Sequence, residues 1–114
     1  MNLAIFTDGF YPQIGGITTA LINHINYLAE NNHNIILFAP KHKELKNEIQ
    51  LKNTKIIRIP SFSSLIYREQ KISFPNIFKV IKILKKYKID IIHIQSPGSI
   101  GIAGCLSAKL IKKP

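Results

Sequence analysis

The sequence predicts an α/β fold in which a parallel sheet carries helices on both faces. Short apolar runs, typical of buried strands, alternate along the chain with longer segments whose apolar residues recur at helical spacing. Strands and helices that alternate in this way are joined by right-handed crossovers, which produce a Rossmann-like parallel sheet. With 114 residues, of which 46% are hydrophobic, the chain can bury one core, and we predict one domain over residues 1–114.

The first predicted elements are a strand, a helix and two further strands. Residues 2–7 form an apolar run, and residues 17–30 carry apolar side chains every three or four positions, so we predict a strand and then a helix. A polar turn leads to a second strand over 35–39, which is expected to end before Pro40. Residues 55–59 fit a third strand near the edge of the sheet.

The remaining elements follow a long connection. Residues 60–75 are predicted to form a loop, and structureless loops of this length are often functional. Residues 76–87 form an amphipathic, basic helix, with apolar residues on one side and lysines on the other. A fourth strand over 89–95 precedes a helix over 99–111 that is rich in glycine and alanine. We expect Cys105 in that helix to be a packed, unreactive side chain.

Charge is unevenly distributed along the chain. The formal net charge is +10, and all 16 Lys and Arg residues lie after Pro40, whereas Asp8 and Glu30 are the only acidic residues before it. This asymmetry favours an anionic partner, either a membrane surface or a nucleic acid, although a solvated lysine face or biased codon usage explains it equally well. The candidate membrane-surface residues are Lys79, Lys82, Lys85 and Lys86.

The sequence predicts neither a membrane-spanning helix nor a secretory signal. Its longest apolar stretch, near residues 91–108, is interrupted by polar residues, proline and glycine. No basic residue precedes the first apolar run. We therefore expect a cytoplasmic protein, and the basic residues suggest a peripheral position at the inner face of the cell membrane.

Two loops that contain glycine are predicted to line one crevice. Gly15 and Gly16 stand between the first strand and its helix, where free N–H groups and the positive end of the helix dipole suit a phosphate or diphosphate. The loop after the fourth strand ends at the same sheet edge, because the carboxyl ends of parallel strands meet there. His93 lies near the end of that strand and can meet a ligand, although strand histidines are more often packed.

Other kinds of site are not supported. A nicotinamide or flavin site needs G-x-G-x-x-G and an acidic residue after the second strand, and a phosphate-binding P-loop needs G-K-[ST]; the chain has neither pattern. Its four histidines are scattered, and no cysteine or acidic residue stands at ligand spacing from them. We therefore expect no metal and no other cofactor.

Two motifs resemble those of retaining glycosyltransferases of family 4, which have the GT-B fold. Residues 8–17, DGFYPQIGGI, are similar to the family's opening pattern D-x-[FY]-x-P-x-x-G-G-[IV]. Residues 90–98, DIIHIQSPG, look like its strand and loop pattern D-[VI]-[VI]-H-x-H-S-P, with Gln95 where a second histidine is common. The order and spacing of the predicted elements fit the family's amino-terminal domain along the whole chain.

The resemblance implies an enzyme that moves a sugar from a nucleotide-sugar to a lipid or glycan acceptor with retention of anomeric configuration, without a bound metal ion. It implies that Gly15 and Gly16 lie against the donor diphosphate and sugar, where loop N–H groups offset charge on the leaving group. It also suggests acceptor and membrane contacts for the basic helix and the 60–75 loop. The candidate acceptor-binding or cleft-lining residues are Asp8, Tyr11, Gln13, His93, Gln95 and Ser96.

The resemblance also implies that these residues are an incomplete amino-terminal, acceptor-side half of a GT-B enzyme. The family's next strand, which ends in a histidine, and the Arg/Lys pair and E-x7-E motif of the donor-binding domain are absent from the sequence. We expect a truncated domain that needs a separate donor-binding domain and transfers no sugar alone. The alternative is a non-catalytic basic module for an anionic membrane or nucleic acid, and membrane is favoured because no aromatic platform for single strands is evident.

Overall fold

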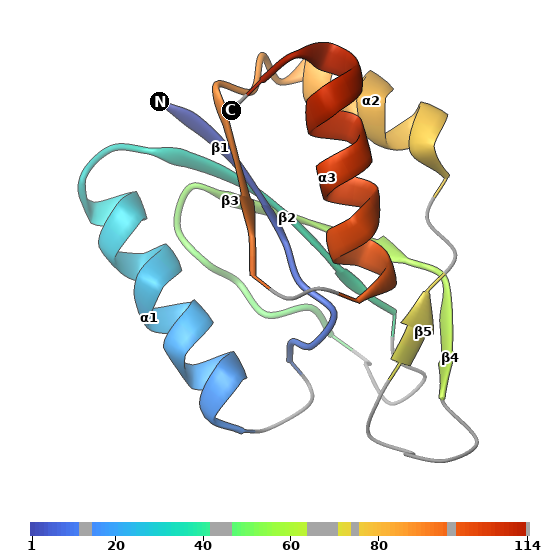
Figure 1. Ribbon diagram of the computed structural model, residues 1–114. Coiled ribbons are helices and arrows are strands. Elements are labelled where there is room, and N and C mark those ends of the chain that lie inside the picture. Colours follow the sequence, from blue (N-terminus) through green and yellow to red (C-terminus); the bar gives the residue numbers. More distant parts are fainter. Residues whose placement is uncertain (12–14, 42–46, 64–70, 74–75, 96–97, 114) are drawn as a thin grey trace.

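The computed structural model describes residues 1–11, 15–41, 47–63, 71–73, 76–95 and 98–113. The chain forms a four-stranded parallel sheet with helices on both faces, as the sequence predicts (Figure 1). The strands of this sheet are β1 (Asn2–Phe6), β2 (Asn34–Pro40), β3 (Thr54–Ile59) and β6 (Ile91–Ile94). The helices are α1 (Gly16–Glu30), α2 (Ile77–Lys86) and α3 (Ser99–Ile111).

The strand order is β3-β2-β1-β6, which places a topological switch point between β1 and β6. The chain runs outward from β1 through β2 to β3 and then returns to the other side of β1. Ligands of open α/β sheets bind beside such a reversal, at the carboxyl ends of the strands. The loops that leave β1 and β6 are the two glycine-containing loops expected to line one crevice.

One face of the sheet is covered by α1. Leu21, Ile25 and Ala29 recur every fourth position on this helix and are almost completely buried. They pack against the strand residues Ile5, Ile35, Leu37 and Ala39 and against Phe10 of the loop after β1. Full burial of a leucine or isoleucine side chain contributes about 1.5–3 kcal/mol, so this layer fixes α1 and the β1 loop together.

The other face is covered by α2 and α3. Val80 and Leu84 of α2 and Ile100 of α3 are buried in this second core. The rings of Phe6 and Phe38 stack beneath them with centroids 4.4 Å apart. The remaining fully or largely buried members of the cluster are Ala4, Ile36, Ile59 and Ile89. Both cores therefore converge on β1 and β2, the inner strands of the sheet.

Gly104 allows α3 to approach the sheet closely. A Cβ atom at this position would lie 2.5 Å from Cδ1 of Ile94 and 2.7 Å from Cγ of Phe6. Any larger residue would have to push the helix away from β1 and β6. The sequence showed only that this helix is rich in glycine and alanine. The structure shows that the glycine at position 104 is needed for close packing.

The 60–75 connection differs from the predicted loop. It contains a short antiparallel hairpin of β4 (Ser61–Ser63) and β5 (Lys71–Ser73), in which Phe62 is in register with Ile72. Three residues per strand are too few for alternation of polar and apolar side chains to show in the sequence. Residues 64–70 and 74–75 of the predicted loop lie outside the described residues.

The second strand continues through Pro40, one residue beyond its predicted end. The amide of Lys41 donates to the carbonyl of Ile59 in β3, so Pro40 faces the opposite, β1 side of the strand. The last pair between β1 and β2 is Phe6 with Phe38. Pro40 lies past that pair, and its missing N–H group removes no hydrogen bond from the ladder.

The side of the fold formed by β6 and α3 is apolar and open. β6 is an edge strand. The exposed apolar residues of α3 recur every fourth position: Ile102, Leu106 and Leu110. Cys105 is also exposed, so the expectation that it is packed was wrong. The glycine- and alanine-rich side of α3 faces the sheet, which turns Cys105 toward solvent. β3, the other edge strand, lies where the sequence predicted.

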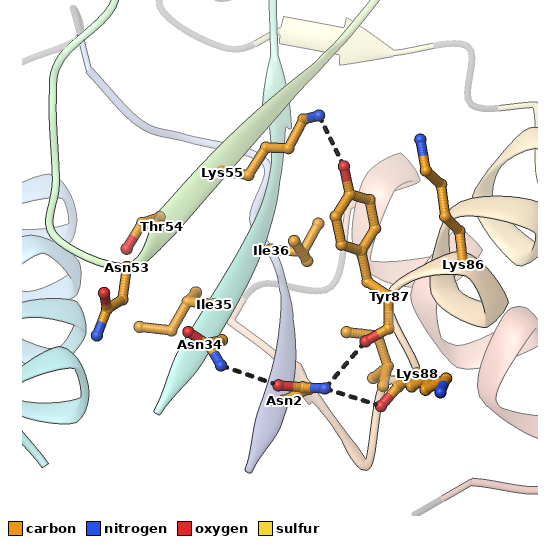
Figure 2. Close-up of a pocket in the computed structure, with 11 residues that line it drawn as sticks. Asn2, Asn34, Ile35, Ile36, Asn53, Thr54, Lys55, Lys86, Tyr87 and Lys88 are labelled. Atoms are coloured by element: carbon orange, nitrogen blue, oxygen red, sulfur yellow. Dashed lines mark hydrogen bonds between the residues drawn. The ribbon is translucent and has the colours of Figure 1, made fainter. Parts of the chain in front are cut away.

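A cavity of about 550 Å³ opens at the amino ends of the strands (Figure 2). It lies between the starts of β2 and β3 and the segment that joins α2 to β6. This edge of the sheet is opposite the carboxyl edge, where the glycine-containing loops meet. None of the helices in the described ranges is long and apolar enough to cross a bilayer.

Candidate functional site

Asp8 connects the two loops at the switch point. Its Oδ1 atom accepts a hydrogen bond of 2.8 Å from the amide of Ile100, and its Oδ2 atom accepts one of 3.2 Å from the amide of Gly101. Gly98, at the N-cap of α3, has no side chain to cap the helix, so a carboxylate from the β1 loop does so instead. This negative charge lies at the positive end of the α3 dipole, where it is favourable.

The close approach of Asp8 also explains a glycine. A Cβ atom at Gly98 would lie 2.4 Å from Cγ of Asp8 and within 2.7 Å of both carboxylate oxygens. The loop after β6 can therefore pass the β1 loop only because it carries glycine at this position. The structure brings these two segments together, as the sequence predicted for the carboxyl edge of the sheet.

His93 and Gln95 form a pair beside this junction. His93 Nε2 lies 2.9 Å from Oε1 of Gln95. The backbone N–H group of Gln95 donates to the carbonyl of Phe6 at the end of β1. His93 is in register with Ile5, which packs under α1, so its exposed side chain is on the α1 side of the sheet. The ring of His24, on α1, lies 5.6 Å from the His93 ring between centroids.

Gly15 and Gly16 begin α1 in open space. A Cβ atom at either position would meet no other atom within 4 Å. Gly15 has φ 167° and ψ 176°, an extended backbone that any residue can adopt. The first turn of α1 carries no acidic residue. The fold itself therefore does not require glycine here, and the positive end of the α1 dipole is accessible to an anion.

Residues 9–11, which follow Asp8, are anchored by buried residues. The hydroxyl of Thr7 donates to the carbonyl of Gly9 at 2.8 Å, which tightens the turn after β1. Phe10 is completely buried in the core under α1, and Tyr11 is half-buried against the same cluster. These contacts fix the start of the loop that leads to Gly15.

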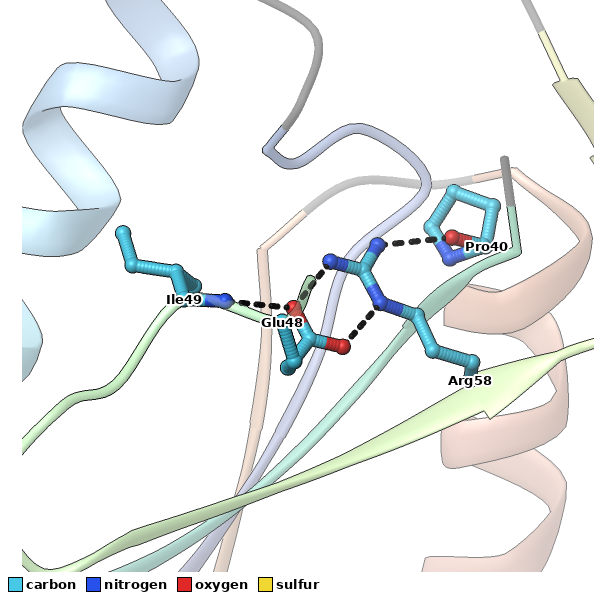
Figure 3. Close-up of polar contacts among 4 residues, drawn as sticks. All are labelled: Pro40, Glu48, Ile49 and Arg58. Carbon is cyan, nitrogen blue, oxygen red and sulfur yellow. Dashed lines mark hydrogen bonds and ion pairs between the residues drawn. The ribbon is translucent and has the colours of Figure 1, made fainter. Parts of the chain in front are cut away.

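Arg58 supports this loop from below. Its Nε and Nη2 atoms donate to the two carboxylate oxygens of Glu48 at 2.7 and 2.6 Å, and Nη1 donates to the carbonyl of Pro40 at 2.8 Å (Figure 3). Its guanidinium carbon lies 5.6 Å from the centroid of the Phe10 ring. The Arg58 side chain thus connects the ends of β2 and β3, the segment before β3 and the β1 loop.

The pair is largely withdrawn from solvent, since the side chains of Arg58 and Glu48 are 11% and 29% exposed. The hydrogen bonds from Arg58 lower the pKa of the Glu48 carboxyl below its ordinary value. Neither residue was selected from the sequence. A signal was present, because Arg58 is a charged residue between Ile57 and Ile59 in a strand, but its partner stands ten residues earlier in a segment with no clear pattern.

The other predicted site residues fall in three places. Gln13 and Ser96 lie outside the described residues. Lys79, Lys82, Lys85 and Lys86 are exposed on α2, which covers the face of the sheet opposite α1 (Figure 1). Of the predicted cleft residues, Asp8 and Gln95 contact the β1–β6 junction directly, and Tyr11 lies at the start of the glycine loop.

The sequence profile of Glycosyltransferase Family 4 matches residues 14–114. The chain belongs to glycosyltransferase family 4. The motif resemblance found in the sequence is therefore confirmed for almost the whole chain.

Curated relatives of this family 4 chain cover it completely but are much longer. The alpha-monoglucosyldiacylglycerol synthase of Streptococcus pneumoniae is 29% identical over 114 residues, which are all of this chain and 25% of that protein. The GDP-mannose-dependent alpha-mannosyltransferase of Corynebacterium glutamicum is 28% identical over 115 residues, covering the whole chain and 28% of that protein. The chain thus spans about a quarter of the length of these relatives.

A solved structure shows the same architecture. MurG from Acinetobacter baumannii, in its crystal structure, matches with a TM-score of 0.57 and 20% identity. The match covers 99% of this chain and 32% of MurG. It agrees with the Rossmann-like, partial GT-B fold of this family 4 chain.

Proposed function

We propose that the chain forms the acceptor-side part of a retaining glycosyltransferase that moves a sugar from a nucleotide-sugar to a lipid or glycan acceptor. Family membership supports sugar transfer, and the names of two relatives include a diacylglycerol glycolipid and a GDP-mannose donor. The structural observation that carries the proposal is the junction of the β1 and β6 loops through Asp8 at the switch point.

In this proposal the donor diphosphate lies against Gly15 and Gly16. The free space at both Cβ positions supports this placement, because a requirement for glycine would then come from the ligand and not from the fold. The N–H groups at the start of α1 would stabilise the charge that develops on the leaving diphosphate. No bound metal ion is needed for this role, so transfer is expected to continue in a chelator.

The acceptor would lie on the other side of the junction. His93 and Gln95 hold each other at the end of β6, and Tyr11 stands at the start of the glycine loop. Asp8 has a positioning role in this scheme, because both its oxygens accept amides of α3 and keep the two loops at a fixed separation. Gln13 and Ser96 complete the proposed set from the sequence motifs alone.

The exposed side of α2 is proposed to contact an anionic membrane surface. Four lysines, Lys79, Lys82, Lys85 and Lys86, are exposed there, and Phe78 beside them is 86% exposed. Lysines with one projecting aromatic ring are suited to a peripheral position on anionic lipids. Because the chain spans only about a quarter of its relatives, a separate donor-binding domain would complete the enzyme, and the chain alone would not transfer sugar.

The test is a transfer assay. The chain is incubated with labelled nucleotide-sugars and lipid vesicles, alone and together with the product of the neighbouring reading frame, in the presence and absence of EDTA. Labelled lipid that forms only in the combined reaction would support the proposal. The same assay is repeated with Gly15→Val and with Asn23→Val, a matched change at an exposed position of α1.

We expect Gly15→Val to abolish transfer while the chain remains folded, because a side chain at this position meets only open space; the change at the N-cap of α1 should lower the melting temperature slightly. Asn23→Val should transfer normally. Full activity of Gly15→Val would rule out a diphosphate at this loop.

The alternative is a non-catalytic basic module. The exposed lysines of α2 are the observation that favours it. It would be supported if the chain binds anionic vesicles and sugar transfer is absent both from the chain alone and from the combined reaction. Vesicle and oligonucleotide binding across a salt series separates the two anionic partners, since purely electrostatic binding weakens steeply as salt rises.

A further inference from the structure

The cavity at the amino edge of the sheet has basic and amide side chains set in a largely apolar lining. The residues that line it are Asn2, Asn34, Ile35, Ile36, Asn53, Thr54, Lys55, Lys86, Tyr87, Lys88 and Ile89. Three of them are lysines and none is acidic. The neighbouring carboxylate of Asp90 accepts a hydrogen bond of 2.9 Å from the backbone N–H group of Asn2. The lining therefore carries a net positive charge in a recess of about 550 Å³.

The ammonium groups of Lys55 and Lys86 both lie beside the Tyr87 ring. Lys55 Nζ donates to the hydroxyl oxygen of Tyr87 at 2.7 Å, and Figure 2 shows the two side chains reaching toward each other from β3 and the end of α2. The Nζ atoms of Lys55 and Lys86 lie 5.3 and 5.5 Å from the centroid of the Tyr87 ring. Two ammonium groups therefore flank one phenol.

This arrangement leaves donors available. The ammonium group of Lys55 has three N–H donors and uses one on Tyr87. Because the Tyr87 oxygen is the acceptor in that bond, its own O–H remains free to donate to another group. The hydrogen bond from Lys55, and the positive charges of Lys55 and Lys86, lower the pKa of the Tyr87 hydroxyl.

The end of α2 does not oppose an anion strongly. Carbonyl groups at a helix C-terminus repel negative charge. Here the side-chain amide of Asn2 donates to the carbonyls of Tyr87 and Lys88 at 3.0 and 3.3 Å. Asn34 in turn donates to Oδ1 of Asn2 at 3.2 Å and holds that amide in place. These bonds occupy carbonyls that would otherwise face the cavity.

We propose that this cavity binds a phosphate group, held by Lys55, Lys86 and the hydroxyl of Tyr87. The group could belong to a lipid headgroup or to a free phosphate, since both present the same oxygens to ammonium and hydroxyl donors. The site lies at the opposite edge of the sheet from the proposed sugar-transfer site. The inference does not rest on that proposal, and either can fail without the other.

A different account of the same residues is that the lysines only pack on the Tyr87 ring and are otherwise solvated. The two accounts differ in what they predict for added phosphate. A built site gives saturable binding that depends on these particular side chains. A solvated basic surface gives weak binding that depends only on total charge.

The experiment titrates the chain with sodium phosphate in one arm and with phosphatidylcholine vesicles that contain phosphatidylglycerol in the other. NMR shifts of the Lys55 and Tyr87 side chains report on phosphate, and co-sedimentation reports on vesicles. The variants are Lys55→Gln and Tyr87→Phe, with Lys109→Gln, an exposed lysine on α3, as a control of equal charge change. Thermal melts confirm that each variant is folded.

We expect Lys55→Gln and Tyr87→Phe each to weaken binding by roughly tenfold, because each variant loses one hydrogen bond to a charged phosphate oxygen. Lys109→Gln should have little effect. Saturation by sodium phosphate would identify a free phosphate as a sufficient ligand, and saturation in the vesicle arm alone would identify a lipid headgroup. Equal weakening in all three variants, unchanged binding in Lys55→Gln and Tyr87→Phe, or no saturation in either arm would overturn the proposal.

Discussion

At the scale of single residues, Arg58 is notable because one side chain serves four separate segments. Its guanidinium group reaches Glu48 and Pro40 by hydrogen bonds and lies against the Phe10 ring. A planar group with several fixed donors can satisfy this geometry, whereas a lysine in its place offers a single ammonium. The consequence is that the base of the glycine loop depends on a charged pair as well as on the apolar core.

Replacement of Glu48 by glutamine should destabilise the fold in a pH-dependent way. The pKa of Glu48 is lowered by Arg58 below its ordinary value of 4.5. A lowered carboxyl pKa means that the pair stabilises the fold above the ordinary pKa and that this contribution is lost as pH falls through the folded-state pKa. We expect Glu48→Gln to reduce the free energy of unfolding by about 1–2 kcal/mol at neutral pH and by less at acidic pH.

Urea unfolding at neutral and acidic pH would check this expectation. Glu30→Gln, at the exposed end of α1, is the matched control and should change little. A loss of stability in Glu48→Gln that is the same at both pH values would contradict the role of the ion pair.

At the scale of elements, the N-terminus of α3 depends on a residue far away in the sequence. Asp8→Ala removes the carboxylate that accepts the amides of Ile100 and Gly101. Loss of a helix N-cap costs about 0.5–2 kcal/mol, and we expect a fall in unfolding free energy within that range. Asp8→Asn retains one acceptor oxygen and should lose less.

Hydrogen exchange of the α3 amides in wild type and Asp8→Ala would locate the effect. Faster exchange confined to the first turn of α3 and to the β1 loop is the expected result. If the α3 amides exchange at the same rates in wild type and in Asp8→Ala, another contact caps the helix.

The elements that the sequence predicted were those with long, regular patterns. Residues 17–30 carry enough apolar positions to define a buried side, and α1 begins at Gly16 and ends at Glu30. The β4–β5 hairpin was missed because each strand has three residues, and the end of β2 was misplaced because a proline at its end costs no hydrogen bond in this ladder.

The candidate site was predicted only in part, for a different reason. The sequence predicted that the β1 and β6 loops lie at one edge of the sheet. In the structure, Asp8 connects them by hydrogen bonds. The Glu48–Arg58 pair and the position of His24 beside His93 depend on how distant segments pack. No local pattern encodes such contacts. The same difficulty explains the error at Cys105, because the sequence alone does not show which side of α3 packs against the sheet.

At the scale of the whole molecule, both sides of the sheet end in an edge strand, β3 on one side and β6 on the other. Beside the β6 edge, α3 carries a row of exposed apolar residues, Ile102, Leu106 and Leu110. These residues are 56%, 48% and 66% exposed. Edge strands with exposed apolar neighbours promote association between chains.

We therefore expect the isolated chain to associate as its concentration rises and Leu106→Lys to reduce this association. The melting temperature should change little, because the leucine is half exposed and makes few core contacts. Sedimentation velocity across a concentration series would measure the effect, with Tyr27→Lys, an exposed position on α1, as control. If Tyr27→Lys reduces association as much as Leu106→Lys does, the β6 side is not the surface responsible.

The carboxylate of Asp8 has one more consequence at this scale. Because it accepts two backbone amides of α3 and belongs to the loop after β1, a displacement of the start of that loop is expected to move the N-terminus of α3 with it. The start of the β1 loop and the first turn of α3 are therefore coupled. If a separate donor-binding domain completes the enzyme, as proposed above, we expect closure around a ligand to come from motion between the two domains.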